Sequence, residues 1–557
     1  MKLTRVGIEQ TGGGAALLNG LDLDLRNPKP GETRTFQPLC LIGPNGSGKS
    51  QFLQSVAEAF QALFHAIVPE EERWDVNPTS AFSMRYVLNR LDAKDDIEVE
   101  VVASQGSTSD HRLALRFRNL GGEWSDVQPT EARALLPTRI VAYTSGENET
   151  LSLPFLASRI AYADEIRTLA IPTQNDEHPS PTTAPTPRLM LIDYSTHLEV
   201  LVANLLLAAP EQRAYVLDQA GLESLRSVRC IVSLNHKAVR NSVRHRPDSQ
   251  RKGVQLTNEL EGYIETLQAC ATAWDYDEAG ERYVFDFWID DESRRAFGST
   301  FEGSFDLYLA FHKLALLNDL AISNPARKRF EADVKKRRFA TRLPEPPEED
   351  KVFRFEEITF CSVQRNDAGK AEPVDYVSLS DGEHQLVQML GVFSMVDEPN
   401  VLFLLDEPES HLNPLWRVKF MSQLSEAPTA RGVRGDPDSQ VAAQDVIITT
   451  HAPFVPSDLP RDQVVIFRKL DEDANPDPKK ARVRAARPDI QTFGASYDQI
   501  LEQCFGVSPP ISQQSQVVIE TLLDSSDLAE VEAGLKTLGP SVERVQVVDH
   551  LDELKKS

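Results

Sequence analysis

The sequence predicts an α/β fold in which buried strands deliver polar loops at their carboxyl ends. An apolar run at 38–42 is followed by a glycine-rich loop and then by apolar residues at helical spacing over 51–60. The apolar run at 401–405 ends in two carboxylates, and the run at 446–448 ends shortly before His451. Short apolar runs are typical of strands buried on both faces, and open α/β sheets bind ligands at the carboxyl ends of such strands.

The loop after the first strand carries the pattern of a phosphate-binding loop. Residues 43–50 match G-x-x-x-x-G-K-[ST] at every fixed position. Glycines allow a close approach of the backbone to phosphate, and successive N–H groups at a helix N-terminus attract it. Lys49 adds a mobile positive charge, and the hydroxyl of Ser50 is a ligand that Mg²⁺ prefers. The loop therefore predicts binding of ATP and Mg²⁺, and the flanking strand and helix disfavour a turn without a ligand. The nucleotide contacts expected here come from Gly43, Pro44, Asn45, Gly46, Ser47, Gly48, Lys49 and Ser50.

The strand at 401–405 places two carboxylates, Asp406 and Glu407, at its carboxyl end. We expect Asp406 to hold the Mg²⁺ shell together with Ser50. Glu407 is expected to polarise the attacking water as general base. A solvated pair of carboxylates at a strand end is the alternative, and the phosphate loop upstream makes it less favoured.

Two later segments make the order of motifs resemble that of ABC-type ATPases of the soluble SMC/RecF/OLD kind. Residues 380–385, SDGEHQ, are similar to the signature loop of that family. They depart from the transporter form at Asp381, where transporters usually carry Gly, and at Glu383, where they carry Gln. Residues 410–414, SHLNP, resemble the D-loop of the same family.

The resemblance implies a site that two copies of the chain build together. Ser380, Gly382 and Glu383 of one copy would close over the γ-phosphate bound to the other, and Asn413 would contact nucleotide. His451 matches the switch histidine, which would assist Lys49 and Glu407 in hydrolysis. For an arbitrary histidine, a satisfied place in the core is the more common role.

One family part has no obvious counterpart, because no Q-loop glutamine follows the strands of the first lobe. The segment 140–149 lies about where that loop is expected. It could replace the loop through backbone carbonyls or through Thr144 and Ser145. An ordinary turn at a strand end is equally compatible with the sequence.

Two stretches point to a narrower group of proteins. Residues 140–156, IVAYTSGENETLSLPFL, and 492–506, TFGASYDQILEQCFG, resemble PtuA-like, restriction-system-associated AAA/ABC ATPases of Septu and retron–Septu antiphage systems. The resemblance implies a sensor that regulates an HNH nuclease, PtuB, and in retron systems also acts with a reverse transcriptase and msDNA. It leaves open whether ATP restrains or activates the complex.

Two other functions are compatible with the same ATP motifs. One is a DNA-repair or loading factor of the RecF/SMC kind that binds DNA directly. The other is an OLD-like nuclease, whose Toprim domain would need carboxylates such as Glu520, Asp549 and Asp552. No glycine follows Glu520, so scaffolding is the favoured interpretation of this region and any nuclease is expected to be a partner.

Composition limits the choice of partners and compartment. The five cysteines are scattered without a C-x-x-C pair, which disfavours zinc and disulfides and favours a cytoplasmic protein. No signal-peptide pattern is seen, and the most apolar stretch, near 198–209, is too short to span a bilayer, so no membrane partner is expected.

The formal charge of −25 argues against nucleic-acid binding by the surface as a whole. Two local basic clusters could still contact phosphates, although a solvated helix face or linker is the favoured interpretation of each. The clusters comprise Lys237, Arg240, Arg244, Arg246, Arg251 and Lys252, and Arg327, Lys328, Arg329, Lys335, Lys336, Arg337 and Arg338.

We expect four regions along the 557 residues. An ABC-type P-loop ATPase head is split into a first lobe at 1–150 and a second at 351–470. A mostly helical insertion, without the heptads of a coiled coil, occupies 151–350. A small partner-binding or scaffold appendage occupies 471–557. Strands are expected at 97–103, 113–117, 229–234 and 283–289, helices at 497–504 and 515–525, and loops at 172–187 and 426–443.

Overall fold

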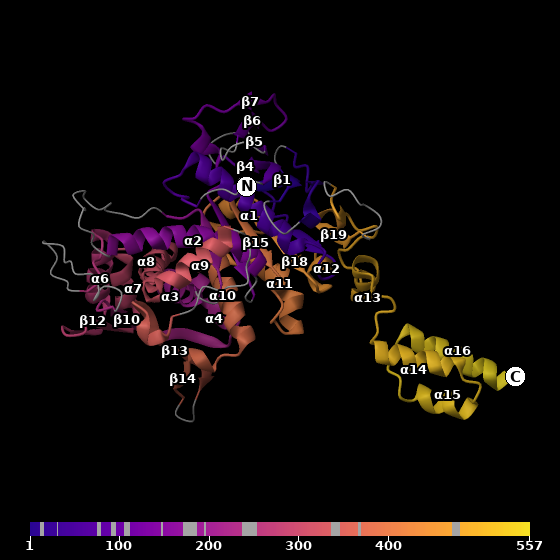
Figure 1. Cartoon of the computed structure of the whole chain (residues 1–557). Coiled ribbons are helices and arrows are strands. Elements are labelled where there is room, and N and C mark those ends of the chain that lie inside the picture. The colour runs from indigo at the N-terminus through magenta and orange to yellow at the C-terminus, as the bar shows by residue number, and fades with distance from the viewer. Residues whose placement is uncertain are drawn as a thin grey trace.

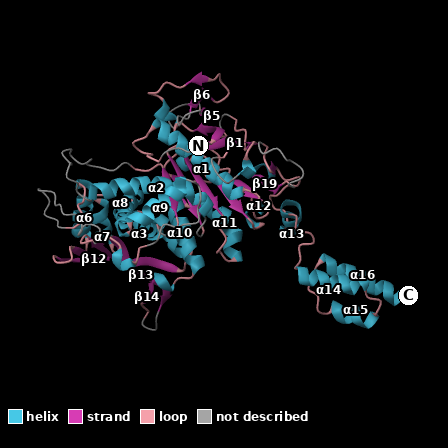
Figure 2. Ribbon diagram, viewed as in Figure 1, coloured by secondary structure: helices cyan, strands magenta, loops and turns pink. Residues whose placement is uncertain are grey.

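A computed structural model shows the P-loop α/β head that the sequence predicts (Figures 1 and 2). Its central sheet is mostly parallel, and helices cover both faces. The predicted fold class is confirmed. The structure describes residues 1–11, 16–29, 32–74, 80–90, 96–104, 112–145, 149–170, 186–193, 196–236, 253–335, 346–365, 369–470 and 480–556.

The central sheet has the strand order β20-β19-β3-β18-β15-β8-β9. Its neighbours from β19 to β9 are parallel, and β20 pairs antiparallel with β19. The apolar runs predicted as strands are therefore adjacent at its centre. The strands are β3 (Leu39–Ile42), β8 (Arg139–Thr144), β9 (Leu189–Ile192), β15 (Val401–Asp406), β18 (Asp445–Thr450), β19 (Val464–Lys469) and β20 (Val483–Ala486).

Alternate residues of these strands face two separate cores. In β15, Leu402 and Leu404 pack with α1 (Lys49–Ile67) and an antiparallel sheet, whereas Phe403 and Leu405 pack with helices on the other face. Because both faces are covered, both sets of side chains must be apolar, as the run shows. The antiparallel sheet consists of β1 (Lys2–Gln10), β2 (Leu21–Asp24), β4 (Ala81–Leu88), β5 (Ile97–Ser104), β6 (Arg112–Asn119) and β7 (Ser125–Asp126).

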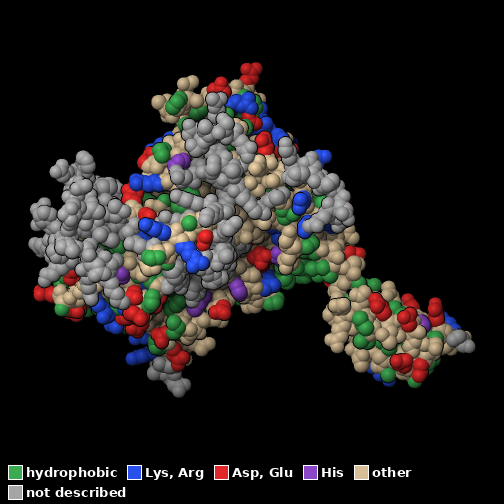
Figure 3. Space-filling model, in the orientation of Figure 1, with side chains coloured by type: hydrophobic (Ala, Val, Ile, Leu, Met, Phe, Trp, Pro, Cys, Tyr) green, Lys and Arg blue, Asp and Glu red, His purple; other side chains and the backbone are tan. Residues whose placement is uncertain are grey.

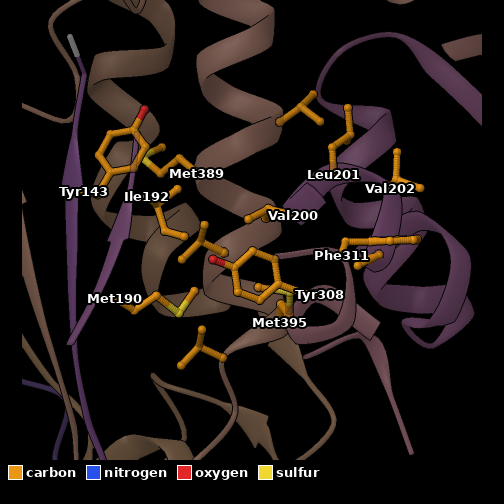
Figure 4. Packing of buried hydrophobic residues seen from close by; sticks show 14 of the residues in the cluster. Tyr143, Met190, Ile192, Val200, Leu201, Val202, Tyr308, Phe311, Met389 and Met395 are labelled. Carbon is orange, nitrogen blue, oxygen red and sulfur yellow. The ribbon is translucent and has the colours of Figure 1, made fainter. Parts of the chain in front are cut away.

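The helix that follows the signature loop, α10 (Asp381–Met395), lies in the second core. Figure 4 shows side chains of α3, α8 and α10 meeting those of β8 and β9 there. Two side chains bind α10 by its backbone: Asn204 Nδ2 donates to Gly391 O at 3.0 Å, and Gln212 Nε2 to Ser394 O at 2.9 Å. The signature loop is thus fixed to the helices of the predicted insertion.

The predicted insertion does not form a separate unit. Its strand β9 completes the central sheet, and its strand β10 pairs along much of its length with β13, beyond the predicted boundary at residue 350. Residues on both sides of that boundary therefore share a second antiparallel sheet of order β11-β12-β10-β13-β14. The expected strands at 229–234 and 283–289 are confirmed within β10 and β12. The elements are α2 (Glu149–Ala170), α3 (His197–Leu207), α4 (Pro210–Asp218), β10 (Leu222–Ser233), α6 (Asn258–Cys270), β11 (Ala273–Asp277), β12 (Arg282–Trp288), α7 (Asp291–Gly298), α8 (Ser304–Leu316), α9 (Asn324–Lys335), β13 (Phe353–Arg365) and β14 (Ala371–Asp375).

The segment 426–443, expected as a surface loop, is partly buried. It contains the small β16–β17 hairpin (Pro428–Thr429 and Gly432–Val433), and Arg434 directly after it is fully buried. The Arg434 guanidinium donates to Gln444 Oε1 and Phe393 O, both at 2.8 Å, and lies over the rings of Phe393 and Phe403. These contacts compensate a burial that lowers the pKa of Arg434 to about 9.

The C-terminal region contains a docked part and a separate bundle. The helix α13 (Tyr497–Ile500) and the turn 501–505 place Ile500 and Cys504 in the main core. The helices α14 (Gln513–Asp524), α15 (Leu528–Leu535) and α16 (Val542–Lys556) pack around a core of their own, away from the head (Figure 1). The helices expected at 497–504 and 515–525 are confirmed.

The three carboxylates considered for a Toprim site lie on helices. Glu520 belongs to α14, and Asp549 and Asp552 belong to α16. They therefore lack the strand ends that the Toprim interpretation requires. Among the described helices, none combines the length and apolar character that would let it cross a membrane.

Removal of the C-terminal bundle should leave the stability of the head unchanged. The core residues of the bundle, such as Val531 and Val547, are distinct from those of the head. A chain ending at residue 506 should melt within about 2 °C of the head transition of the full chain, because no core contact is lost.

A chain ending at residue 495 is the matched control for this truncation. It also removes Ile500 and Cys504, both fully buried, and should melt several degrees lower. Equal melting temperatures for the two truncated chains, measured by calorimetry, would show that the division between the two cores is misplaced.

Candidate nucleotide-binding site

Three parallel strands bring the predicted motifs to one edge of the central sheet. Asp406, the last residue of β15, is opposite Thr449 of β18, and Thr450 is opposite Ile42 of β3. The phosphate loop, Glu407 and His451 leave these strands side by side. The parallel pairing therefore assembles residues separated by hundreds of positions in the sequence.

The phosphate loop has the conformation that its glycines predict. Gly43, Gly46 and Gly48 all have positive φ angles, and Gly48 directly precedes α1. A Cβ at Gly43 would lie 2.1 Å from Phe467 O, so only glycine fits beside β19. The buried hydroxyl of Ser47 has no hydrogen-bond partner among the described residues. A buried donor of this kind in a ring of backbone N–H groups fits a phosphate ligand.

Lys49 is held inside this loop. Its Nζ donates to Gly43 O at 2.9 Å and to Pro44 O at 3.2 Å, and lies 3.0 Å from His451 Nε2. Burial lowers the pKa of Lys49 to about 8, while Glu407 and Asp406 favour the charged form. The ammonium is therefore within reach of both the loop and the switch histidine.

Ser50 and Asp406, the predicted Mg²⁺ ligands, are in contact. Ser50 Oγ donates to Asp406 Oδ1 at 3.0 Å, and Thr449 Oγ1 donates to the same oxygen. Burial raises the pKa of Asp406, and the two hydroxyls oppose this shift. Among the described residues, no group of three His, Cys, Asp or Glu side chains is arranged to hold a metal. The pair therefore fits Mg²⁺ that takes its remaining ligands from phosphate and water.

Glu407 is fixed by its backbone and by His451. Its φ angle of 48° is rare for a residue other than glycine, and its N–H donates to Thr449 O at 3.1 Å. Glu407 Oε1 accepts from His451 Nε2 at 2.8 Å. This hydrogen bond holds the pKa of Glu407 below its usual range, so the partly exposed carboxylate is ionised and can accept a proton.

A third acid near this site, Glu409, was not predicted from the sequence. Glu409 is 2% exposed, and its Oε1 accepts from Thr450 Oγ1, directly before His451. Its neighbour Ser410 donates to Ser145 Oγ at 2.6 Å, which links the D-loop to the segment considered as a Q-loop substitute. The only sequence signal was a third acid two residues after Glu407. Gly146, Glu147 and Asn148 lie outside the described residues.

The signature loop lies apart from the phosphate loop of its own chain. Ser380 caps α10 and forms a reciprocal capping box with Glu383. Gly382 lies against the D-loop, because a Cβ there would be 3.3 Å from His411 O. Among the described residues, no hydrogen bond or ion pair joins 380–383 to 43–50.

Asn413 has a structural role in this conformation. Its side chain accepts from Trp416 N and caps α11 (Pro414–Glu426), so its contact with nucleotide stays a prediction. The structure thus joins the phosphate loop, Asp406, Glu407 and His451, but not the signature loop or Asn413.

The described part of the basic clusters gives a mixed result. Residues 237–252 and 336–338 lie outside the described residues. Arg327 is buried and pairs with Asp164 of α2 at 3.3 Å, so the prediction that it could contact phosphate is wrong. Lys328 and Arg329 are exposed.

One family model matches the part of the chain that follows the phosphate-loop lobe. Residues 278–458 match the model described as "AAA domain, putative AbiEii toxin, Type IV TA system", and this segment contains the signature loop, Asp406, Glu407 and His451. This part of the chain is therefore similar to an AAA-type ATPase domain. A search of curated proteins found no match.

Solved structures with some similarity include RecF and UvrA2. One is a structure of the recombination mediator protein RecF with ATP, from the RecFOR pathway, which is 10% identical in sequence. The match covers 80% of this chain and 93% of the RecF chain, with a TM-score of 0.22. UvrA2 from Deinococcus radiodurans is 12% identical and covers 87% of this chain and 56% of its own, with a TM-score of 0.24. At these TM-scores, the similarity carries no argument about function.

Substitution of Glu409 by Gln should change how stability depends on pH. Burial raises the pKa of Glu409 from 4.5 to about 7, so between these values the folded state binds more protons than the unfolded state. The contribution of Glu409 to stability is thus complete below pH 4.5 and is lost as the pH rises through 7. Glu409→Gln keeps the acceptor for Thr450 and should stabilise the protein by about 1–3 kcal/mol at pH 8, but much less at pH 5.

Urea unfolding of wild type and Glu409→Gln at the two pH values measures this difference. Glu223→Gln, at an exposed carboxylate, is the control and should show little change with pH. A stability difference for Glu409→Gln that is the same at pH 5 and pH 8 would contradict the assignment.

Proposed function

We propose that the chain is an ATP-driven switch in which two copies close around ATP and open after hydrolysis. The proposal rests on the way the structure divides the predicted nucleotide contacts into two groups. The phosphate loop, Asp406, Glu407 and His451 form one hydrogen-bonded group, whereas the described contacts leave Ser380–Glu383 unlinked to the phosphate loop of the same chain. A second copy in head-to-tail arrangement would supply the missing signature loop.

The proposed chemistry uses the contacts within the first part. Glu407, ionised and held by His451, would accept a proton from the attacking water. Lys49 would move from the carbonyls of Gly43 and Pro44 to the phosphates of the substrate. Mg²⁺ bound to Ser50 and Asp406 would neutralise charge on those phosphates. The capped N-terminus of α10 would direct a partial positive charge at the γ-phosphate bound to the other copy.

We further propose that this switch regulates an HNH nuclease in antiphage defence. The proposal rests on the resemblance of 140–156 and 492–506 to PtuA-like ATPases, and a reverse transcriptase with msDNA would join it in a retron system. The C-terminal bundle supplies a surface for a protein partner, with exposed Val517, Val518, Val542 and Val545.

Complementation between two inactive variants tests the shared site. Lys49→Ala removes the phosphate-loop charge, and Ser380→Arg blocks the signature loop. Each variant alone should hydrolyse ATP at a negligible rate. In an equimolar mixture, about half of the pairs contain one copy of each variant. One of the two sites in such a pair has both an intact Lys49 and an intact Ser380, which should restore roughly a quarter of wild-type activity.

A mixture of Lys49→Ala with Glu407→Gln is the control for this experiment. Both residues belong to the same part of the site, so each of the two sites in a mixed pair carries one of the two defects, and no recovery of activity is expected. If the Lys49→Ala and Ser380→Arg mixture shows no recovery while the single variants are folded, the two-copy site is refuted.

The Glu407→Gln protein should accumulate as an ATP-bound dimer. The amide cannot accept a proton from water, but it keeps the size of the side chain and the bond to His451. Light scattering after size exclusion should show a mass near twice 62.1 kDa with ATP and Mg²⁺, and a smaller mass without them. The double variant Lys49→Ala/Glu407→Gln should keep the smaller mass with ATP and Mg²⁺. If the mass of neither protein changes when ATP is added, the proposed closure of two copies is contradicted.

The defence role predicts an HNH-nuclease gene beside the gene for this chain. The nuclease, expressed together with the chain, should co-purify with it, and Val517→Asp/Val545→Asp should release it without changing the ATPase rate. A neighbourhood of replication or repair genes, with no nuclease, would move the function toward direct DNA repair and would leave the ATP switch intact.

A further inference from the structure

A cationic hollow lies on the face of the molecule formed by α3, α4 and α7. It has a volume of about 680 Å³ and is open to solvent. Its lining consists of Leu206 and Leu207 at the end of α3, Arg213 of α4, and Asp291, Arg294, Arg295, Gly298 and Ser299 in and directly after α7. It shares no lining residue with the ATP site. The hollow is thus a distinct concave surface of the described chain.

The arginines of this hollow are only weakly neutralised. Arg294 Nη1 lies 3.7 Å from Asp291 Oδ1, and the Asp291 side chain is 91% exposed. Ion pairs of that length and exposure contribute little. Arg295 pairs with Glu292 on the exposed side of the same helix. The buried Nε of Arg294 has no hydrogen-bond partner among the described residues.

Arg213 adds a second guanidinium with limited neutralisation. Its Nη1 donates to Ala208 O, a neutral acceptor. Burial lowers the pKa of Arg213, and the positive charge of Arg294 lowers it further, whereas Asp291 opposes this shift. The two guanidinium groups therefore repel each other, and an anion between them would relieve this repulsion. Such a concentration of positive charge is unexpected in a chain of net charge −25.

We propose that this hollow binds the phosphate group of a ligand other than the ATP that the chain hydrolyses. Two guanidinium groups offer planar forks of N–H donors that match phosphate oxygens in pairs. The residues that line the hollow include no aromatic ring on which a base could stack. The ligand is therefore recognised through phosphate, carried either by a nucleic-acid backbone or by a free nucleotide.

A ligand in the hollow could change the position of the signature loop, because two hydrogen bonds join α3 and α4 to α10. Gln212, beside Arg213 on α4, donates to Ser394 O of α10, and Asn204 of α3 donates to Gly391 O of the same helix. A ligand that draws α4 and α7 together would thereby shift α10, whose N-terminus carries Ser380. The hollow is placed to couple a phosphate ligand to ATP turnover.

Binding of two probes to the full chain tests the proposal. A fluorescein-labelled single-stranded 20-mer and inorganic pyrophosphate are titrated in turn, with the ATP site kept saturated by a non-hydrolysable ATP analogue and Mg²⁺. The double variant Arg213→Gln/Arg294→Gln should bind at least one probe roughly tenfold more weakly than wild type. The surface variant Arg133→Gln/Arg365→Gln removes the same charge from arginines paired with carboxylates elsewhere, and should bind as wild type does.

A second variant keeps the arginines and changes only the hollow. A Cβ at Gly298 would contact only Leu207 Cδ2, at 3.9 Å, so a side chain there points into open space. Gly298→Glu should weaken binding as the double variant does, whereas Gly298→Gln should weaken it much less. Basal ATPase activity and the melting temperature should be unchanged in both Gly298 variants.

The outcomes separate the sources of the phosphate. Loss of oligonucleotide binding identifies a nucleic-acid backbone, and loss of pyrophosphate binding alone identifies a free nucleotide. If neither probe binds the wild type, or if binding is equal in wild type, Gly298→Glu and the double variant, the proposed site does not exist.

Discussion

The chemistry of this molecule depends on the parallel pairing of β3, β18 and β15. Hydrogen-bonded strands lie about 4.8 Å apart, so the loops that leave them at the same edge must meet within the reach of side chains. This spacing allows Ser50 to contact Asp406 and Lys49 to contact His451 across more than 350 positions of sequence. A slip of β15 by one residue would turn Asp406 to the opposite face of the sheet and break its contact with Ser50.

The parts that could be predicted are those with a local pattern. Apolar runs of four or five residues identify buried strands. The glycine pattern of 43–50 predicts a phosphate-binding loop from the local sequence alone. Positions such as Glu409 and Arg434 could not be recognised in this way. Each is a charged residue in a polar segment. Only the fold shows that Glu409 is hydrogen-bonded to Thr450 and that Arg434 lies over the rings of Phe393 and Phe403.

The sheet that spans the predicted boundary at residue 350 could not be predicted for a related reason. The pairing of β10 with β13 joins residues more than a hundred positions apart, and strand pairing at that distance leaves no periodic trace in either segment. The same holds for β9, whose four apolar residues are too few to distinguish a sheet strand from a buried turn. The contacts of the candidate nucleotide site could be predicted because their residues belong to sequence motifs. The contacts that hold α10 to α3 and α4 come from residues outside any motif, such as Asn204.

The short connection before the C-terminal bundle has a consequence for binding strength. Residues 507–512 can extend over at most about 20 Å, so each bundle remains close to the head that carries it. In a closed pair of heads, two bundles would lie within one small volume, and a partner that touches both would experience an effective concentration in the millimolar range. Opening of the heads would separate the bundles and abolish this avidity, although no single contact in either bundle would change. A weakly binding partner could thus be retained or released by geometry alone.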